Sequence, residues 1–199
     1  MEFKIEHTEV YGLNKAIIAS GNAMRVEMDD NTGEPTKKDL KRAYSLGSTG
    51  TGEGHDNFLN AIIVQFDLYA PLYMWKQIQR YHFMDFASSQ STMHRLAKFD
   101  IGKQCVADTD WKILERYQDL LNEYNHMESG EDKDRMWRTL VASLPCGFVL
   151  GATMTTNYRQ LKTIYFQRKA HKLKEWHEFC AWCETLPMFK ELCLGGSKE

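Results

Sequence analysis

Long apolar runs are missing from this sequence. No stretch approaches the roughly 20 consecutive apolar residues that a transmembrane helix needs. The opening segment, MEFKIEHTEVYG, also lacks the apolar core of a signal peptide. We therefore expect a cytoplasmic protein without a membrane partner.

An excess of one charge is missing as well. The chain has 25 Lys and Arg against 27 Asp and Glu, and the two signs are interspersed, giving a net charge of −2. Proteins that bind nucleic-acid polymers usually carry a basic patch, stripe or tail. The composition therefore argues against DNA or RNA as the main partner.

The five cysteines lack the even number and spacing of a disulfide framework, so we expect reduced thiols. His177, Cys180 and Cys183 have the spacing of metal ligands, but they fall within one continuous helical pattern. A tetrahedral metal site needs ligands from a turn or a second element, so packing in the core is favoured over a metal site. Cys146 has no identifiable catalytic partner and is expected to be buried.

The length of 199 residues and the apolar content of 43% fit one domain, residues 1–199, with a sizeable core. Period-two and helical patterns predict an α+β fold with a central, mostly antiparallel sheet packed with long helices. The expected strands are residues 2–10, 60–70 and 146–156. The expected helices are residues 34–44, 71–81 and 108–127, a segment between residue 134 and Pro145, and one long region from 157 to 184.

Two details of these helices are specific predictions. On the helix at 108–127 we expect Trp111, Leu114, Leu121 and Tyr124 to share the inner face. The long region from 157 should be capped by one of the two threonines at 155–156.

The segment GSTGTGEG at residues 47–54 has alternating glycines. It could cradle a phosphate, but no strand pattern flanks it, so a mobile loop is favoured. Asn157, Arg159, Gln167 and Arg168 lie at and beyond a capped helix start, where anions bind well. A phosphate or carbonyl site and a solvated helix face both remain open there.

Residues 80–96, RYHFMDFASSQSTMHRL, concentrate two arginines, two histidines and three serines behind an apolar helix. We expect Arg80 and His82 to be partly desolvated. Arg80 can pair with a planar or anionic ligand, and His82 can donate or accept a proton near neutral pH. The alternatives are a binding site, which is favoured, and a capped helix boundary without a ligand.

From residue 55 to about 176, the sequence resembles the flavin-dependent thymidylate synthase family. The motifs that carry the resemblance are HDNFLNAIIVQFDLYAP, QIQRYH, SSQSTMH, LP, TTNYRQL and FQR, in the family's order and at near-family distances. The resemblance implies a homotetramer with FAD-containing active sites between subunits. It also implies methylation of C5 of dUMP, with methylenetetrahydrofolate as one-carbon donor and NADPH supplying hydride through the flavin.

The resemblance also assigns roles to individual residues. Those that match flavin contacts are His55, Asn57, Arg80, Tyr81, His82, Ser89, Asn157 and Arg159. Those that match nucleotide contacts are Gln77, Arg80, Ser91 and Arg168. Arg80 and Arg168 are the implied catalytic residues. Arg168 matches an arginine that polarises uracil, and a cation there stabilises the negative charge that develops as C5 becomes nucleophilic.

The sequence departs from the family where the family's arginines hold the substrate phosphate. Residues 80–82 read Arg-Tyr-His instead of Arg-His-Arg, and Ser89 replaces a glutamate. Met93 and Val141 fall where the family has phosphate-binding arginines. Charge-assisted hydrogen bonds contribute about 1.5–3 kcal/mol each. Losing two would weaken binding by about 10² to 10⁴.

We therefore expect weak binding of dUMP unless Arg95, Lys98 or Lys103 replaces the lost charge. Two hypotheses follow. The first is an FAD-dependent enzyme that transfers a one-carbon unit to C5 of dUMP or a modified pyrimidine nucleotide. The second is a catalytically degenerate homologue that binds FAD or a nucleotide as a structural or regulatory ligand.

Overall fold

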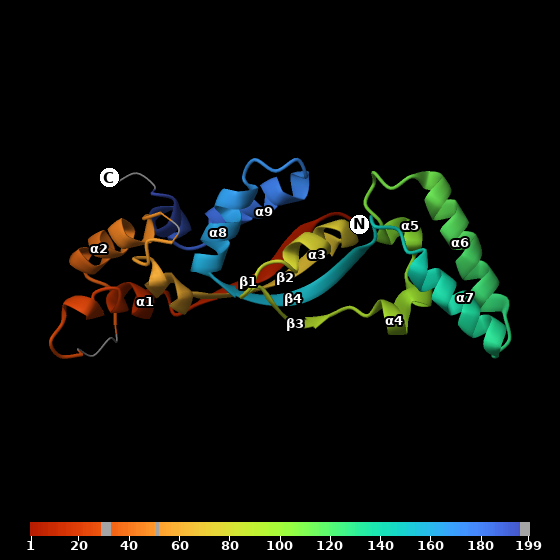
Figure 1. Ribbon diagram of the computed structural model, residues 1–199, viewed down its shortest axis with the longest axis horizontal. Helices are drawn as coiled ribbons and strands as arrows, with labels where there is room; N and C mark the ends of the chain where they lie inside the picture. Colours follow the sequence, from red (N-terminus) through yellow and green to blue (C-terminus); the bar gives the residue numbers. More distant parts are fainter. Residues whose placement is uncertain (29–32, 51, 196–199) are drawn as a thin grey trace. The chain divides into compact units, whose positions relative to one another are not determined.

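The computed structural model describes residues 1–28, 33–50 and 52–195 (Figure 1). The strands are β1 (Lys4–Tyr11), β2 (Ile63–Pro71), β3 (Asp85–Ser89) and β4 (Val149–Asn157). The α-helices are α1 (Leu13–Ala19), α2 (Lys37–Gly47), α3 (Leu72–Ile78), α4 (Thr92–Arg95), α5 (Ile101–Gln104), α6 (Trp111–His126), α7 (Glu131–Ala142), α8 (Tyr158–Arg168) and α9 (Lys174–Thr185). Shorter helical turns are η1 (Asn22–Met24), η2 (Asn57–Ala61), η3 (Leu96–Lys98) and η4 (Lys190–Leu194).

The four strands form one antiparallel sheet in the order β1-β2-β4-β3. The predicted α+β fold with an antiparallel sheet is therefore confirmed. β2 shows why the period-two pattern succeeded, because Val64, Phe66 and Leu68 are at most 1% exposed. β3 was not predicted. It is a short edge strand whose five residues are all exposed, so it has no buried alternating face to detect.

The chain divides into two compact units, and β2 and β4 each contribute residues to both. Unit 1 comprises residues 1–4, 67–80 and 86–153. Unit 2 comprises residues 5–66, 81–85 and 154–199, of which the structure describes the parts given above. The expectation of a single domain stays a prediction.

Unit 1 contains a helical hairpin, α6 and α7, which lie side by side (Figure 1). Its buried core comprises Leu96, Ile101, Cys105, Tyr117, Leu120, Leu121, Leu140 and Phe148. The Tyr117 hydroxyl donates to the Leu140 carbonyl at 2.9 Å, so the hairpin's one buried phenol is satisfied among the described residues. The first turn of α3 is satisfied too, because Leu72 N and Tyr73 N donate to carbonyls of the segment 146–148.

Unit 2 is organised around α8, which packs against α9, η2 and η4. Its largest buried side chains include Tyr158, Trp176, Phe179 and Phe189. The Tyr158 hydroxyl donates to the Pro187 carbonyl at 2.7 Å, which joins α8 to the segment after α9. Burial raises the pKa of Tyr158 well above its ordinary range, and the thiols of Cys193 and Cys183 and then Glu191 add to the shift.

Three predictions about the helices were wrong. Trp111 is 64% exposed, because it is the first residue of α6 and precedes the turns that pack on α7. Neither threonine at 155–156 caps α8, because β4 continues to Asn157 and the Asn157 side chain accepts from Gln160 N. The long helix is broken at residues 169–173, where His171 N bonds to the Arg168 carbonyl and Leu173 N bonds to the His171 ring.

Among the described residues, no helix is both long enough and apolar enough to cross a bilayer.

Candidate functional site

The start of α8, in unit 2, positions two of the predicted flavin contacts. Asn157 is buried as the N-cap, and its side-chain oxygen accepts from Gln160 N at 2.9 Å. Arg159 follows in the first turn with about a third of its side chain exposed, at 33%. Its Nε donates to Asp56 Oδ1 at 3.0 Å. The helix start therefore presents a guanidinium that a buried carboxylate holds by one edge.

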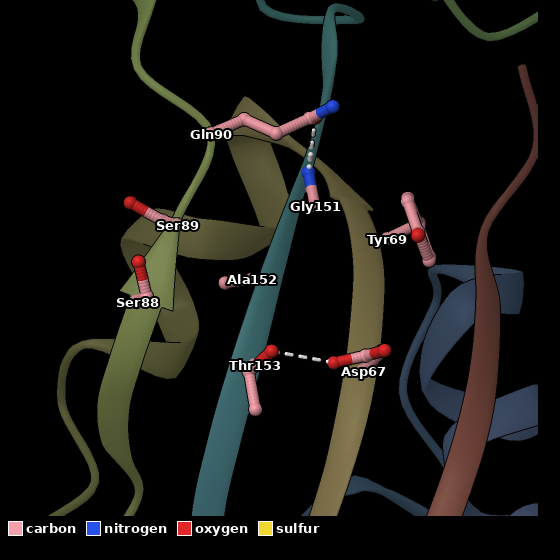
Figure 2. A pocket seen from close by; sticks show the side chains of 8 residues that line it. All are labelled: Asp67, Tyr69, Ser88, Ser89, Gln90, Gly151, Ala152 and Thr153. Atoms are coloured by element: carbon pink, nitrogen blue, oxygen red, sulfur yellow. Dashed lines mark hydrogen bonds between the residues drawn. The ribbon is translucent and has the colours of Figure 1, made fainter.

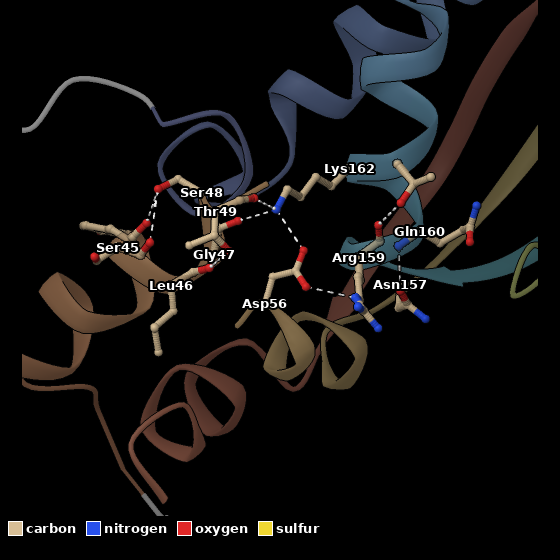
Figure 3. Close-up of polar contacts among 12 residues, drawn as sticks. Ser45, Leu46, Gly47, Ser48, Thr49, Asp56, Asn157, Arg159, Gln160 and Lys162 are labelled. Atoms are coloured by element: carbon tan, nitrogen blue, oxygen red, sulfur yellow. Dashed lines mark hydrogen bonds and ion pairs between the residues drawn. The ribbon is translucent and has the colours of Figure 1, made fainter. Parts of the chain in front are cut away.

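Asp56 is shared with a second cation, Lys162, one turn further along α8 (Figure 3). Lys162 Nζ lies 2.8 Å from Asp56 Oδ2, and both side chains are 2% exposed. The same ammonium donates to the Gly47 carbonyl at 2.8 Å and to the Thr49 carbonyl at 2.7 Å. The start of the glycine-rich segment therefore turns its carbonyls toward α8. Residue 51 of that segment lies outside the described residues.

The sequence motifs assign no role to Asp56 or Lys162. A signal for Lys162 was present, because Tyr158, Leu161 and Ile164 of the same helix are buried and a charged residue shares their face. Asp56 stands between His55 and Asn57, both of which are exposed. The buried carboxylate thus anchors the segment that carries these two predicted flavin contacts.

The end of α8 brings together two more predicted residues, Arg168 and Tyr81. Arg168 Nε donates to the Tyr81 hydroxyl at 2.6 Å. The guanidinium carbon lies 4.7 Å from the ring centroid of Trp176 and 5.5 Å from that of Tyr81. A guanidinium packed between aromatic rings gains cation–π energy and loses side-chain freedom. Arg168 is therefore a fixed cation, as the predicted role in polarising a ring requires.

His171 lies just beyond Arg168, and its ring meets that of Trp176 edge to face with centroids 6.3 Å apart. Burial lowers the pKa of His171, and the charges of Arg168 and then His177 lower it further. The shift favours the neutral form of this histidine. His82 differs from its prediction, because it is exposed rather than partly desolvated and precedes Phe83, which has a φ of 59°.

The remaining predicted residues lie in unit 1. Gln77 is half-buried in α3, and Arg80 is exposed just beyond the end of that helix, so its predicted desolvation was wrong. Ser89 is exposed at the end of β3. Ser91 caps the four-residue helix α4, where its hydroxyl accepts from His94 N at 3.3 Å.

Ser89 lines two neighbouring cavities of unit 1. The larger, of about 360 Å³, includes Trp75, Phe86 and Gln79, with the two rings 5.1 Å apart. The smaller, of about 220 Å³, is polar and includes Asp67 and Thr153, which are hydrogen-bonded at 2.6 Å (Figure 2). An aromatic-sided cavity bordered by a serine and an amide suits a planar ring with polar edges.

The two positions where the family has phosphate arginines are structurally different from each other. Met93 is 57% exposed on α4, and Arg95 is exposed two residues further along the same helix. Val141 is half-buried and packs against the core of the α6–α7 hairpin. An arginine at 141 would therefore face an apolar cluster in this chain.

The described residues contain no group of histidine, cysteine or acidic side chains that could hold a metal ion. Cys180 and Cys183 are buried in α9, as the packing interpretation expected. Cys146 is exposed, which corrects its predicted burial; it lies in the turn between α7 and β4.

The charge of the cluster at α8 suits an anionic cofactor such as FAD. Asp56 is the one carboxylate paired with both Arg159 and Lys162 among the described residues, so this cluster keeps one surplus positive charge. The exposed part of that charge is on Arg159. Arginine pairs well with phosphate, and the first turn of a helix favours anions.

No protein-family model and no curated protein sequence matches the chain. Solved structures do match it. A flavin-dependent thymidylate synthase from Helicobacter pylori, solved with FAD and dUMP, is 17% identical at a TM-score of 0.68, covering 97% of this chain and 98% of that one. A UMP/dUMP methylase, PolB from Streptomyces cacaoi, bound to 5-Br dUMP, is 14% identical at a TM-score of 0.66, covering 96% and 94%. The chain therefore has the fold of the flavin-dependent thymidylate synthases.

Proposed function

We propose that the protein is an FAD-dependent enzyme that transfers a one-carbon unit from methylenetetrahydrofolate to C5 of a pyrimidine deoxynucleotide. The acceptor is dUMP or a modified relative, and NADPH is the hydride donor. The observation that carries the proposal is the fixed position of Arg168, which Tyr81 and Trp176 hold. The fold around it is similar to that of a thymidylate synthase solved with FAD and dUMP. A catalytically idle scaffold has no need of a braced arginine at that place.

Cofactor binding is assigned to unit 2. Arg159 pairs with the phosphates, Asn157 holds the helix start in position, and His55 and Asn57 offer exposed polar groups from the anchored segment. Tyr81 adds a ring and His82 an exposed imidazole. FAD supplies hydride-transfer chemistry when it is bound. The protein's part is to orient the cofactor and to exclude water from the reacting edge.

Activation of the nucleotide is assigned to Arg168. Its fixed charge stabilises the negative charge that develops on the pyrimidine oxygen as C5 becomes nucleophilic. The fixed geometry matters, because a cation that is already oriented needs no reorganisation when the charge develops. In unit 1, Gln77, Arg80, Ser89 and Ser91 are assigned to the nucleotide and the flavin ring, where amide, guanidinium and hydroxyl groups match the polar edges of both.

A second candidate function is a degenerate homologue that binds FAD or a nucleotide as a structural or regulatory ligand. The phosphate side favours it. Met93 has no hydrogen-bond donor, and Val141 packs in an apolar cluster instead of facing a ligand. The two candidates differ in turnover, and the degenerate homologue can also hold a nucleotide instead of flavin.

The first test is flavin binding. Purified protein is incubated with FAD, desalted and then denatured, and the released flavin is read by its visible absorbance. We expect flavin close to one per chain. An equal result for the Arg159→Ala variant would remove α8 from the proposed site. A colourless parent protein would end the enzymatic candidate and leave only the nucleotide-binding form of the second.

The second test separates the candidates. Flavin-loaded protein is given NADPH, methylenetetrahydrofolate and dUMP, and the base is analysed for a new C5 substituent. The enzyme predicts a methylated or otherwise one-carbon-modified product. Flavin binding without any product from dUMP or its base-modified relatives would favour the structural or regulatory role.

A further inference from the structure

Lys162 is a buried lysine with a complete set of partners. Its ammonium has three protons, and three oxygens accept them, those of Gly47, Thr49 and Asp56, at 2.7–2.8 Å. Burying an ammonium is costly, and a buried ion pair seldom adds net stability over an apolar pair of the same shape. Its presence on the inner face of α8 therefore calls for a role other than packing.

The geometry shows what Lys162 acts on. Asp56 accepts from Lys162 with one oxygen and from Arg159 with the other, so the position of the carboxylate decides where Arg159 is held (Figure 3). The terminal nitrogens of Arg159 have no hydrogen-bond partner among the described residues. They are the part of the cluster that is available to a ligand.

We propose that Lys162 is a positioning residue, which holds Asp56 so that Arg159 presents its terminal nitrogens to the phosphates of the cofactor. The inference rests on the proposed function and adds to it a residue that makes no contact with the ligand. Without Lys162, one oxygen of Asp56 loses its partner in a buried place, and the carboxylate turns toward another donor. Arg159 then loses its brace and must order its long side chain on binding.

The anchor has a second consequence for the same site. Because Lys162 holds the carbonyls of Gly47 and Thr49 as well as Asp56, it ties the segment 47–49 to the residue that stands between His55 and Asn57. The effect through Arg159 and the effect through this segment can be told apart, because only the first depends on the arginine.

The experiment is a double-mutant cycle read with two probes, FAD and inorganic pyrophosphate, by titration calorimetry. The variants are Lys162→Met, Arg159→Gln and the two combined. Lys169→Met is the matched control, because it removes an exposed lysine from the end of the same helix. We expect Lys162→Met to weaken both probes by roughly tenfold to a hundredfold, the worth of one charged hydrogen bond. In the Arg159→Gln background the same change should have little further effect on pyrophosphate, and on FAD only the smaller effect that passes through His55 and Asn57.

Each outcome decides something. Additive losses would overturn the inference, because Lys162 would then act independently of Arg159. Coupling with pyrophosphate but no binding of FAD would support the positioning role and contradict the proposed function. FAD binding without coupling would support the proposed function and contradict the positioning role. A parent that binds neither probe would contradict both.

The cycle also has a safeguard against misfolding. If Lys162→Met does not fold, as judged by circular dichroism and thermal unfolding, Asp56→Asn replaces it. This variant keeps the shape of the side chain and removes the charge that links the two cations. The same dependence on Arg159 is expected, and additivity would again overturn the inference.

Discussion

Arg168 is singled out by the sequence resemblance, and in the structure Tyr81 and Trp176 hold it in place. The second residue of the family's Arg-His-Arg motif is Tyr81 in this chain, and its hydroxyl accepts from Arg168 Nε. The tyrosine that replaces the family's histidine therefore has a role of its own, because it holds the arginine that the proposed chemistry needs. Trp176, 0% exposed, supports the guanidinium with its ring.

The Arg168→Ala variant should lose C5 chemistry and keep its flavin. Removing one stabiliser of a developing negative charge costs about 10²–10³ in rate. Tyr81→Phe is the matched variant, because it keeps the ring and removes only the hydroxyl that orients Arg168, so it should lose less activity. Product formation and bound flavin are measured on both. Full activity in Arg168→Ala would show that the residue assignment on this helix is wrong.

Binding of dUMP should be weak and should strengthen in Met93→Arg. Position 93 is exposed on α4, where an arginine can be added without burying its charge. Val141→Arg is a poor test, since it would place a charge against the apolar core of the hairpin. We expect Met93→Arg to improve the dUMP dissociation constant by roughly tenfold or more.

Arg95→Ala is the companion to that experiment. Arg95 lies on the same short helix as Met93 and is exposed. Tight binding of dUMP by the parent that collapses in Arg95→Ala would mean that Arg95 has taken over the phosphate. If neither substitution changes the affinity measured by calorimetry, this helix has no part in holding the substrate.

The candidate site residues could be proposed from the sequence only where a motif carries them. Arg159 and Arg168 follow from the spacing in TTNYRQLKTIYFQR, and both take part in organised clusters. Asp56 and Lys162 do not follow, because their meaning depends on a tertiary contact that joins residues 106 apart. Local sequence patterns do not show which buried cation pairs with which buried carboxylate.

At the level of single elements, polar caps and close backbone approaches set the ends and spacing of the described helices and strands. Thr36 begins α2 with a reciprocal capping box, in which its side chain accepts from Asp39 N and Asp39 accepts from Thr36 N. This helix was predicted at residues 34–44, and its first residue is Lys37. β3 and the break between α8 and α9 were missed, because neither has an apolar period or a Gly or Pro to mark it.

Asp39→Asn should destabilise the protein by about 1 kcal/mol at neutral pH. Hydrogen bonds from the Thr36 side chain, from Arg42 and from the Thr36 backbone lower the pKa of Asp39 to about 2. A lowered acid pKa means that the stabilisation is complete above the ordinary range near about 4 and is lost as pH falls toward about 2. Urea unfolding between neutral and acid pH should therefore show the two proteins converging.

The control for that experiment is Asp119→Asn, an exposed aspartate on α6. It removes the same charge without a capping role, so its effect should be small at every pH. A constant difference between Asp39→Asn and the parent down to the acid limit would contradict the capping interpretation.

Gly151→Ala should destabilise β4 through its neighbour on β2. A Cβ at this position would lie 2.7 Å from a ring carbon of Tyr69, so the ring has to move. Overpacking of this kind costs about 1–3 kcal/mol. Tyr69→Leu removes the ring, so the double variant should regain most of the melting temperature lost in Gly151→Ala. Additive losses would show that the glycine is needed for another reason.

At the scale of the molecule, the fold class could be predicted because strong periodicity marks β2, α6 and α7 within the chain. The order of the strands could not, since β1-β2-β4-β3 places β3 at an edge with no apolar face of its own. The order of strands depends on which strand edges pair with one another. The side-chain pattern of a strand indicates only which of its faces is buried. The division into two compact units was not predicted either, because β2 and β4 contribute to both and no linker separates them.

The protein should form a homotetramer, the assembly that the family resemblance implies with active sites between subunits. The single chain leaves several large apolar side chains more than 40% exposed, among them Phe83, Phe86, Trp111, Ile113 and Phe166. Exposed apolar side chains are common at surfaces that bind another copy of the chain, and closed symmetry buries them on every copy at once. Light scattering at micromolar concentration should give the mass of four chains.

Replacing Phe86 by Ser should shift that mass downward if its surface is part of an interface, while Lys98→Ser, an exposed polar change, should not. A monomer in the parent would contradict the assembly and weaken the case for an active site shared between subunits.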